Sequence, residues 1–205
     1  MPASTPTPST ARSRARPMTP QRRREHLVDV TLMLLREHGR EVTTRQIAEA
    51  AGVAEGTIFR AFATKEELVE AAITQAFDVA PLLARLTEIE ADLPLEQRLV
   101  RLVGVLQQRL RATFDLLGRV GMVRPPDHDA PEARAARARL HAALVDVVAP
   151  RPHDTDTLAL PVEEVVHRLR LLTFAGSHQH IADGHLLTPE EIVATVLHGV
   201  LTHPR

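Results

Sequence analysis

The sequence predicts an all-α protein, and three features of its 205 residues lead to this prediction. Hydrophobic residues make up 44% of the chain, yet Tyr and Trp are absent and only five Phe occur, which favours an aliphatic core of the kind that helices bury. Apolar residues recur at helical spacing behind recognisable capping signals. Strand-like alternation never extends beyond a few residues.

Four helices are expected in the first third of the chain, over residues 20–38, 44–51, 55–62 and 65–77. The first starts behind Thr19 with a proline in its first turn and ends at Gly39. A threonine followed three residues later by Gln or Glu opens the second and the fourth as a capping box. The second and third are short and joined by a turn at Gly52, which is the helix-turn-helix pattern.

The remainder of the chain predicts further helices over residues 95–120, 132–148, 162–183 and 189–201, separated by proline-rich loops. Pro81 is expected to bend or break the fourth helix. Residues 1–18 are rich in Arg and Pro and poor in hydrophobic residues, so a disordered arm is expected there.

Charge is unevenly distributed, although the net charge is only −1. Residues 1–65 carry eleven basic and six acidic side chains, whereas residues 66–205 carry fourteen and twenty. An excess of basic residues in the N-terminal part of the chain indicates that this part contacts a polyanion. The alternative is a solvated Arg-rich arm, because five of the eleven basic residues precede Arg24.

A specific resemblance lies between Thr43 and Leu68. The groups TTRQIA, AGV, GTIFRAF and TKEEL are similar in type and spacing to the DNA-binding domain of TetR-family transcriptional regulators, over about residues 22–75. The resemblance implies an N-terminal three-helix helix-turn-helix DNA-binding domain over residues 19–65. It also implies an all-helical ligand-sensing and dimerisation domain over residues 66–205, where only length and helical layout match the family.

The resemblance also implies which residues meet DNA, because the second helix of a helix-turn-helix presents its N-terminal residues to base edges in the major groove. Those expected at or near bases are Arg45, Glu55, Gly56 and Thr57, and those expected near phosphates are Thr44, Phe59, Arg60 and Lys65. Arg45 suits guanine and Glu55 suits cytosine, while Gly56 permits close approach.

Three positions depart from the family's usual pattern, since Ala54, Phe59 and Ala61 replace polar residues that are common there. The Arg-rich arm is expected to compensate by binding the minor groove or the backbone, and a solvated tail is the alternative. Phe59 and Phe62 are also expected to be packing residues, with the phosphate-facing Arg60 between them in the sequence.

Other classes of site find little support in the sequence. Cysteine and the signatures of common catalytic sites are absent, so neither an enzyme nor a cofactor is expected. His178, His180 and His185 crowd one segment, but nearby acids lack metal-ligand spacing, so an interface or pocket is favoured over a metal site. In a helix, His178 and His185 would share one face.

The resemblance implies three partners: double-stranded DNA with a palindromic operator, a second copy of the chain, and an unidentified small apolar effector between the C-terminal helices. The last two helices are expected to pair two subunits through Phe174, Ile181, Val193, Val196, Leu197, Val200 and Leu201, with Gly176 and Gly199 allowing close approach. A repressor is expected that is released when the effector shifts the fourth helix. The alternatives are an activator or a regulator controlled by a protein partner.

A cytoplasmic location without membrane contact is also expected. No apolar run approaches 18 residues, and the N-terminal segment lacks the apolar stretch of a secretory signal.

Overall fold

The computed structural model describes residues 18–122, 130–154 and 157–198, and within these ranges all regular structure is helical. The expected all-α fold is therefore confirmed. In chain order the helices are α1 (Pro20–His38), the short 3-10 helix η1 (Gly39–Glu41), α2 (Thr44–Ala50), α3 (Glu55–Ala61), α4 (Lys65–Ala76), α5 (Ala80–Thr87), α6 (Leu95–Arg119), α7 (Pro131–Val148), α8 (Val162–Ser177) and α9 (Pro189–His198).

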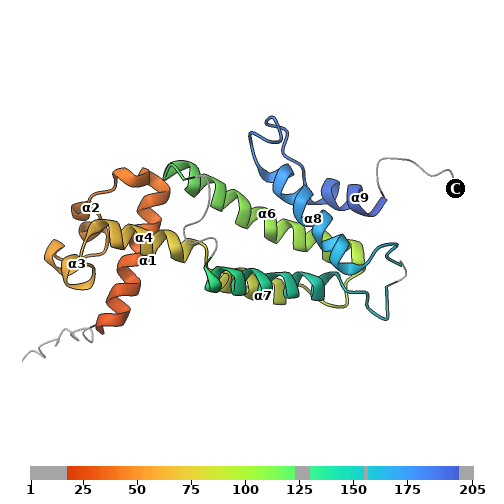
Figure 1. Cartoon of the computed structure of the whole chain (residues 1–205), viewed down its shortest axis with the longest axis horizontal. Helices are drawn as coiled ribbons and strands as arrows, with labels where there is room; N and C mark the ends of the chain where they lie inside the picture. Colours follow the sequence, from red (N-terminus) through yellow and green to blue (C-terminus); the bar gives the residue numbers. More distant parts are fainter. Residues whose placement is uncertain (1–17, 123–129, 155–156, 199–205) are drawn as a thin grey trace, which may run out of the picture.

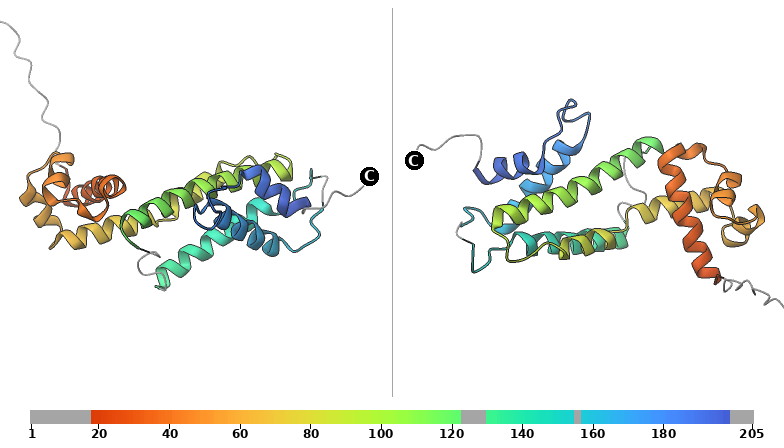
Figure 2. Two further views of the ribbon diagram at one scale, coloured as in Figure 1. Left: turned by 90° about the horizontal axis from the view of Figure 1, so that it is seen from above. Right: turned by 180° about the vertical axis from the view of Figure 1, so that it is seen from behind.

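The molecule is elongated, with α1–α3 at one end and α7–α9 at the other (Figure 1). The long helix α6 starts among the C-terminal helices and ends beside α1, and both further views agree on this placement (Figure 2). The two ends of the molecule are therefore joined through α4 and α6.

Most helix starts follow the capping signals of the sequence. The Oγ1 of Thr19 accepts from the backbone amide of Arg22 at 3.3 Å. The box at the start of α2 is complete, because Thr43 and Gln46 each accept from the other's backbone amide, at 3.2 and 2.8 Å. No side chain caps α3, as the alanine at position 54 predicts.

One helix boundary was predicted wrongly, because α8 ends at Ser177 and not near residue 183. The chain turns back after it, with Asp183 and Gly184 at φ values of 47° and 81°. The amide of Leu187 then donates to the carbonyl of Gly176 at 3.0 Å. A Cβ on Gly176 would approach the Leu187 side chain to 3.0 Å, so the glycine accommodates a contact within its own chain.

Pro81 breaks the path of the fourth helix, which was one of the two outcomes expected. Helix α4 ends at Ala76, and Pro81 lies in the first turn of α5, where its missing amide hydrogen costs nothing. The carboxylate of Asp78 accepts from the amide of Ala80 at 3.0 Å and so supports the start of α5.

The buried apolar side chains form two clusters that share α6. The first core is built by α1–α4 together with Leu116 and Val120, near the end of α6. The second core is built by α5–α9 and includes Leu95–Leu106 of the same helix. The boundary predicted at residue 65 falls at the first residue of α4, whose apolar face belongs to the first core.

A close joint connects the end of α6 to the end of α1. Gly39 has φ +62°, and a Cβ there would lie 2.5 Å from the carbonyl oxygen of Arg119. The Nε of Arg40 donates to the carbonyl of Val120 at 3.0 Å, and an Nη of Arg119 donates to the carbonyl of Glu37 at 3.4 Å. Only glycine fits at position 39, on grounds of both backbone angle and space.

A buried ion pair fixes the opposite end of α6. Arg98 and Asp154 form a bidentate pair at 2.9 and 3.0 Å, and both side chains are almost fully buried. The remaining guanidinium hydrogens donate to the carbonyls of Leu93, Val147 and Ala149. The Arg98 hydrogen bonds lower the pKa of Asp154 from 3.8 to about 2, against the opposing effect of burial.

The joint at Gly39 predicts unequal effects for alanine substitution at two glycines with similar φ values. We expect Gly52→Ala, with φ +65° and no atom within 4 Å of its new Cβ, to lower the unfolding free energy by about 1 kcal/mol. Gly39→Ala adds a collision with the Arg119 carbonyl, so we expect a loss of at least about 2 kcal/mol. Urea denaturation measures both, and equal losses would show that α6 does not press on this glycine.

The buried ion pair predicts a pH-dependent stability. Because the pKa of Asp154 is lower in the folded chain, its contribution is complete above the unfolded value of 3.8 and is lost as the pH falls toward about 2. At pH 7 we expect Asp154→Asn to lower the unfolding free energy by about 3–5 kcal/mol. Urea titrations at several pH values should show this deficit shrinking below about pH 4. The control Asp146→Asn changes an exposed carboxylate 3.4 Å from Arg151 and should have little effect, and a deficit constant from neutral to acidic pH would contradict the account.

Candidate nucleic-acid interface

The turn between α2 and α3 is fixed by backbone hydrogen bonds and by α1. Gly52 has φ +65°, and the amide of Val53 donates to the carbonyl of Ala48 at 3.0 Å. The Nε2 of His26, on α1, lies 3.2 Å from the carbonyl oxygen of Ala51. The angle between the two short helices is therefore set by contacts on both sides of the turn.

The eight residues predicted to meet DNA lie at the starts of α2, α3 and α4 and along α3. Arg45, Glu55, Gly56, Phe59 and Arg60 are exposed, and Thr44, Thr57 and Lys65 are half-buried. The structure joins two of them directly, since the Thr44 hydroxyl donates to the Glu55 carboxylate. The Nζ of Lys65 donates to the carbonyl of Arg40 at 3.3 Å. The contact of all eight with DNA stays a prediction.

Gly56 is not required by the packing of the chain itself. A Cβ at this position would meet no atom within 4 Å, and its φ lies outside the left-handed range. The space above Gly56 is therefore open at the second residue of α3, the end that a recognition helix directs at base edges.

The two phenylalanines of this region differ sharply in exposure. Phe62 is 1% exposed and lies in the first core with Ile58, four residues earlier on the same helical face. Phe59 is 52% exposed, so the expectation that it is a packing residue is wrong. At one residue past Ile58 it is rotated by about 100° from the buried face. Its ring is instead available on the outer surface of α3.

Arg24 has a structural role that counting charges did not reveal. Its guanidinium lies 3.8 Å from the centre of the Phe62 ring and donates to the carbonyl of Ala61. It also pairs with Glu67 at 3.0 Å. One α1 side chain thus connects the C-terminal end of α3 to the start of α4, and its guanidinium has three partners within the chain.

Glu67 completes this arrangement from α4. Its amide donates to the Oγ1 of Thr64 at 3.1 Å, which is half of the expected capping box. Its carboxylate accepts from the amide of Ala63 at 2.7 Å in place of the Thr64 amide. The Ala63 hydrogen bond, followed by that of Arg24, lowers the pKa of Glu67.

The arm expected over residues 1–18 lies outside the described residues apart from Met18, which is exposed. Its proposed contact with the minor groove therefore stays a prediction.

The histidine segment forms part of an aromatic group. The ring centre of His178 lies 4.6 Å from that of Phe114 on α6, and Phe114 lies 5.1 Å from Phe174 on α8. His180 follows at 6.0 Å from His178, whereas His185 is not part of the group. Because α8 ends at Ser177, the expectation that His178 and His185 share a helix face is wrong. Across the described ranges, no three His, Asp or Glu side chains are grouped as a metal site would require.

The apolar surface predicted for pairing two subunits is only partly available. Val193 is fully buried in the second core, and Val196 and Leu197 pack against it. Gly199, Val200 and Leu201 lie outside the described residues. The exposed apolar residues near α8 are Leu171, Phe174 and Ile181, each 45–58% exposed. The surface open to a second copy is thus centred on α8 and the turn after it.

None of the helices in the described ranges is long and apolar enough to span a membrane.

Comparisons with known proteins agree with the helix-turn-helix geometry. Residues 27–72 match the family model described as "Bacterial regulatory proteins, tetR family". The uncharacterized HTH-type transcriptional regulator YvkB of Bacillus subtilis (strain 168) is 46% identical over 52 residues, which are 25% of this chain and 28% of that protein. The match thus spans little more than a quarter of that relative's length.

Solved structures extend the likeness to the whole fold. A tetR-family transcriptional regulator from Streptomyces coelicolor superposes with a TM-score of 0.57 at 24% identity, over 88% of this chain and 79% of that one. The regulator FadR from Bacillus subtilis, solved in complex with stearoyl-CoA, has a TM-score of 0.57 at 13% identity, over 86% and 99% of the two chains. At these identities the likeness concerns the fold.

Proposed function

We propose that this chain, a member of the tetR family of bacterial regulatory proteins, is a sequence-specific DNA-binding transcriptional regulator that acts as a homodimer. The observation that carries the proposal is the free N-terminal end of α3. Its inner face is held by Ile58 and Phe62, whereas Glu55 and Gly56 are exposed. A helix held from behind and open at its N-terminus is what major-groove reading requires.

Polar groups suited to base edges surround this end of α3. Arg45 can bind guanine O6 and N7 with two hydrogen bonds, and Glu55 can accept from cytosine N4. The hydrogen bond from Thr44 orients the Glu55 carboxylate before DNA arrives. These side chains supply the sequence preference in the proposal.

The phosphate backbone is assigned to the flanking groups. Lys65 occupies the first position of α4, where its ammonium group and the free helix amides both favour a phosphate oxygen. Arg60 and Phe59 lie on the outer surface of α3, where Arg60 contributes charge and the Phe59 ring contributes apolar contact. These contacts position the protein without selecting a sequence.

A homodimer follows from the reading of a palindromic operator, because each subunit reads one half-site. Leu171, Phe174 and Ile181 offer exposed apolar area to a second copy. Within the proposal these residues form the centre of the subunit interface.

The regulator is proposed to be a repressor that a small ligand releases from its operator. FadR from Bacillus subtilis has been solved with stearoyl-CoA, so a protein of this fold accepts a small-molecule ligand. In the proposal a ligand among the C-terminal helices displaces α4 and α6 and thereby changes the spacing of the two α3 helices. It acts only through unequal affinity for the two arrangements.

The DNA-binding proposal predicts two different losses for two basic residues. Arg45→Ala should lower affinity for the cognate operator by about 1–3 kcal/mol and relax the preference at one base pair. Lys65→Ala should weaken binding about equally on all sequences and reduce the slope of log K against log salt concentration by about 1. Fluorescence anisotropy with DNA from upstream of the gene measures both, and Arg101→Ala, on the far half of α6, serves as the unaffected control. Equal loss on cognate and random DNA for Arg45→Ala would remove its base-reading role.

The dimer proposal predicts that charge on the exposed face of α8 separates the subunits. Leu171→Glu and Phe174→Glu should each raise the dimer dissociation constant by about tenfold or more. The reason is that burying an unpaired carboxylate in the subunit interface costs free energy. Sedimentation velocity over a concentration series gives the constant, with Leu160→Glu as an exposed apolar control outside this face. Unchanged dimerisation in both variants would place the interface elsewhere.

A further inference from the structure

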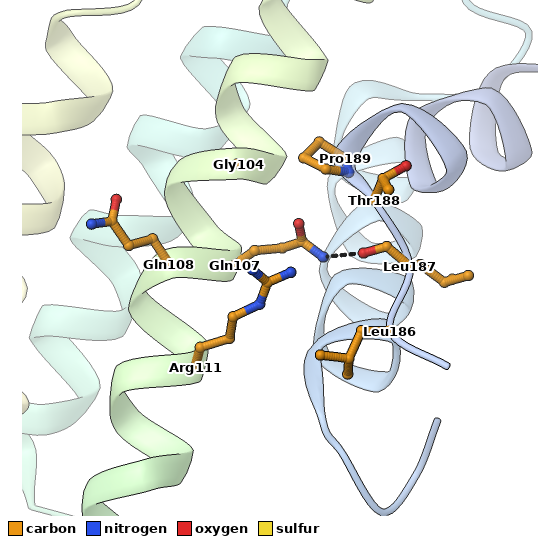
Figure 3. Close-up of a pocket in the computed structure, with 8 residues that line it drawn as sticks. All are labelled: Gly104, Gln107, Gln108, Arg111, Leu186, Leu187, Thr188 and Pro189. Atoms are coloured by element: carbon orange, nitrogen blue, oxygen red, sulfur yellow. Dashed lines mark hydrogen bonds between the residues drawn. The ribbon is translucent and has the colours of Figure 1, made fainter. Parts of the chain in front are cut away.

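A cavity of about 430 Å³ opens between α6 and the segment that leads into α9 (Figure 3). It is called the α6 groove here, and it is lined by Gly104, Gln107, Gln108, Arg111, Leu186, Leu187, Thr188 and Pro189. Four of these come from consecutive turns of α6. A Cβ on Gly104 would lie 3.9 Å from Pro189, so the missing side chain keeps this end of the groove open. The volume lies in the range of small-molecule sites.

Gln107 presents an unused acceptor in the groove. The residue is 2% exposed, and its Nε2 donates to the carbonyl of Leu187 at 2.8 Å. Its Oε1 accepts no hydrogen bond from any described residue, and Figure 3 shows this oxygen directed toward Pro189 across the groove. This acceptor has no donor within the described part of the chain and faces the groove, so the geometry favours a ligand that brings an N–H or O–H group.

Arg111 supplies the charge of the groove. Its guanidinium extends along the same face of α6 as Gln107, whereas Gln108 points away and accepts from Arg85 (Figure 3). Arg111 has no ion pair with the described part of the chain, and no acidic residue lines the groove.

Two acids stand nearby at the start of α9, Glu190 and Glu191. The Glu191 carboxylate accepts from the amide of Thr188 at 2.8 Å and is thus engaged in the helix cap. A guanidinium next to such a groove is suited to a carboxylate or phosphate, which it binds with two hydrogen bonds.

We propose that the α6 groove binds a small organic acid. The anionic group pairs with Arg111, a hydrogen-bond donor of the ligand satisfies the Oε1 of Gln107, and an apolar body contacts Leu186, Leu187 and Pro189. This deepens the proposed function, on which it rests for its biological meaning, and it replaces the expected apolar effector with an amphipathic acid.

The position of the groove connects it to the DNA-binding end through one helix. From Arg111 to Arg119 is eight residues of continuous helix, or about 12 Å. The carbonyl of Arg119 meets Gly39, and Leu116 and Val120 lie in the first core. A ligand that separates α6 from residues 186–189 therefore moves the helix that supports α1.

The test compares two acids with their neutral amides on the full chain. Each probe carries a hydroxyl group as the donor for Gln107, so that acid and amide share this donor and differ in charge. Titration calorimetry with 3-hydroxyoctanoate, 3-hydroxyoctanamide, 6-hydroxy-2-naphthoate and 6-hydroxy-2-naphthamide should show at least one acid binding about tenfold more tightly than its amide, because a charge-assisted pair is lost in the amide. Arg111→Gln should lower the affinity for that acid by about tenfold and abolish its preference over the amide. The control Arg101→Gln changes an exposed arginine of α6 outside the groove, and it should leave the dissociation constants of the acid and of its amide unchanged.

Three results would overturn the proposal: equal binding of acid and amide, unchanged acid affinity in Arg111→Gln, or no binding of either acid up to about 10 mM. In a separate gel-retardation assay, the ligand-free chain is tested for binding to DNA from upstream of its gene. If the chain binds the acid but does not retard the DNA, the proposed regulatory function is wrong and the acid-binding site stands. If the chain retards the DNA but binds neither acid, only the proposed site is wrong. When both hold, bound acid should lower DNA affinity in the parent protein and not in Arg111→Gln.

Discussion

The position of α3 at the DNA-binding end depends on the contacts that the guanidinium of Arg24 makes with its neighbours. It lies on the ring of Phe62, donates to the carbonyl of Ala61 and pairs with Glu67. Helix α3 has only seven residues, too few to be stable in isolation, so its position is imposed by contacts with its neighbours. Arg24 supplies those contacts at the C-terminal end and leaves the N-terminal end exposed. The same side chain fixes the start of α4, which leads to the rest of the chain.

A second constraint joins this end to the C-terminal helices. Leu116 of α6 and Val120, which directly follows this helix, belong to the first core, so one helix takes part in both cores. Gly39 allows the Arg119 carbonyl to approach as closely as it does, and the Arg98–Asp154 pair holds the opposite end of α6. The α6 groove lies between these two contact points, on the same continuous helix.

Local signals in the sequence predicted the helix starts well, because a cap depends on residues three or four apart. They predicted the end of α8 poorly, since the contact of Gly176 with Leu187 and the turn at Asp183 and Gly184 depend on tertiary packing. Counting charges placed Arg24 among the basic residues available to DNA, because sequence does not reveal the tertiary contacts of a side chain. Val193 was expected at a subunit interface for the same reason, as its apolar side chain serves the chain's own core.

The candidate sites differ in how far the sequence predicted them. The residues at the starts of α2, α3 and α4 form one compact motif, and the structure brings them together on exposed helix ends. The α6 groove combines residues 104–111 with residues 186–189, and no local pattern links segments so far apart in the chain. Its charged and amide groups are the basis for proposing an amphipathic acid where an apolar effector was expected.

We infer that Arg24 positions α3 and does not itself contact DNA. The most direct test is the salt dependence of operator affinity for Arg24→Gln, measured beside the parent protein by fluorescence anisotropy. We expect the affinity to fall while the slope of log K against log salt concentration stays within about 0.3 of the parent value, because no phosphate contact is lost. A slope reduced by about 1 would contradict the account, since it would show that this guanidinium neutralises a phosphate.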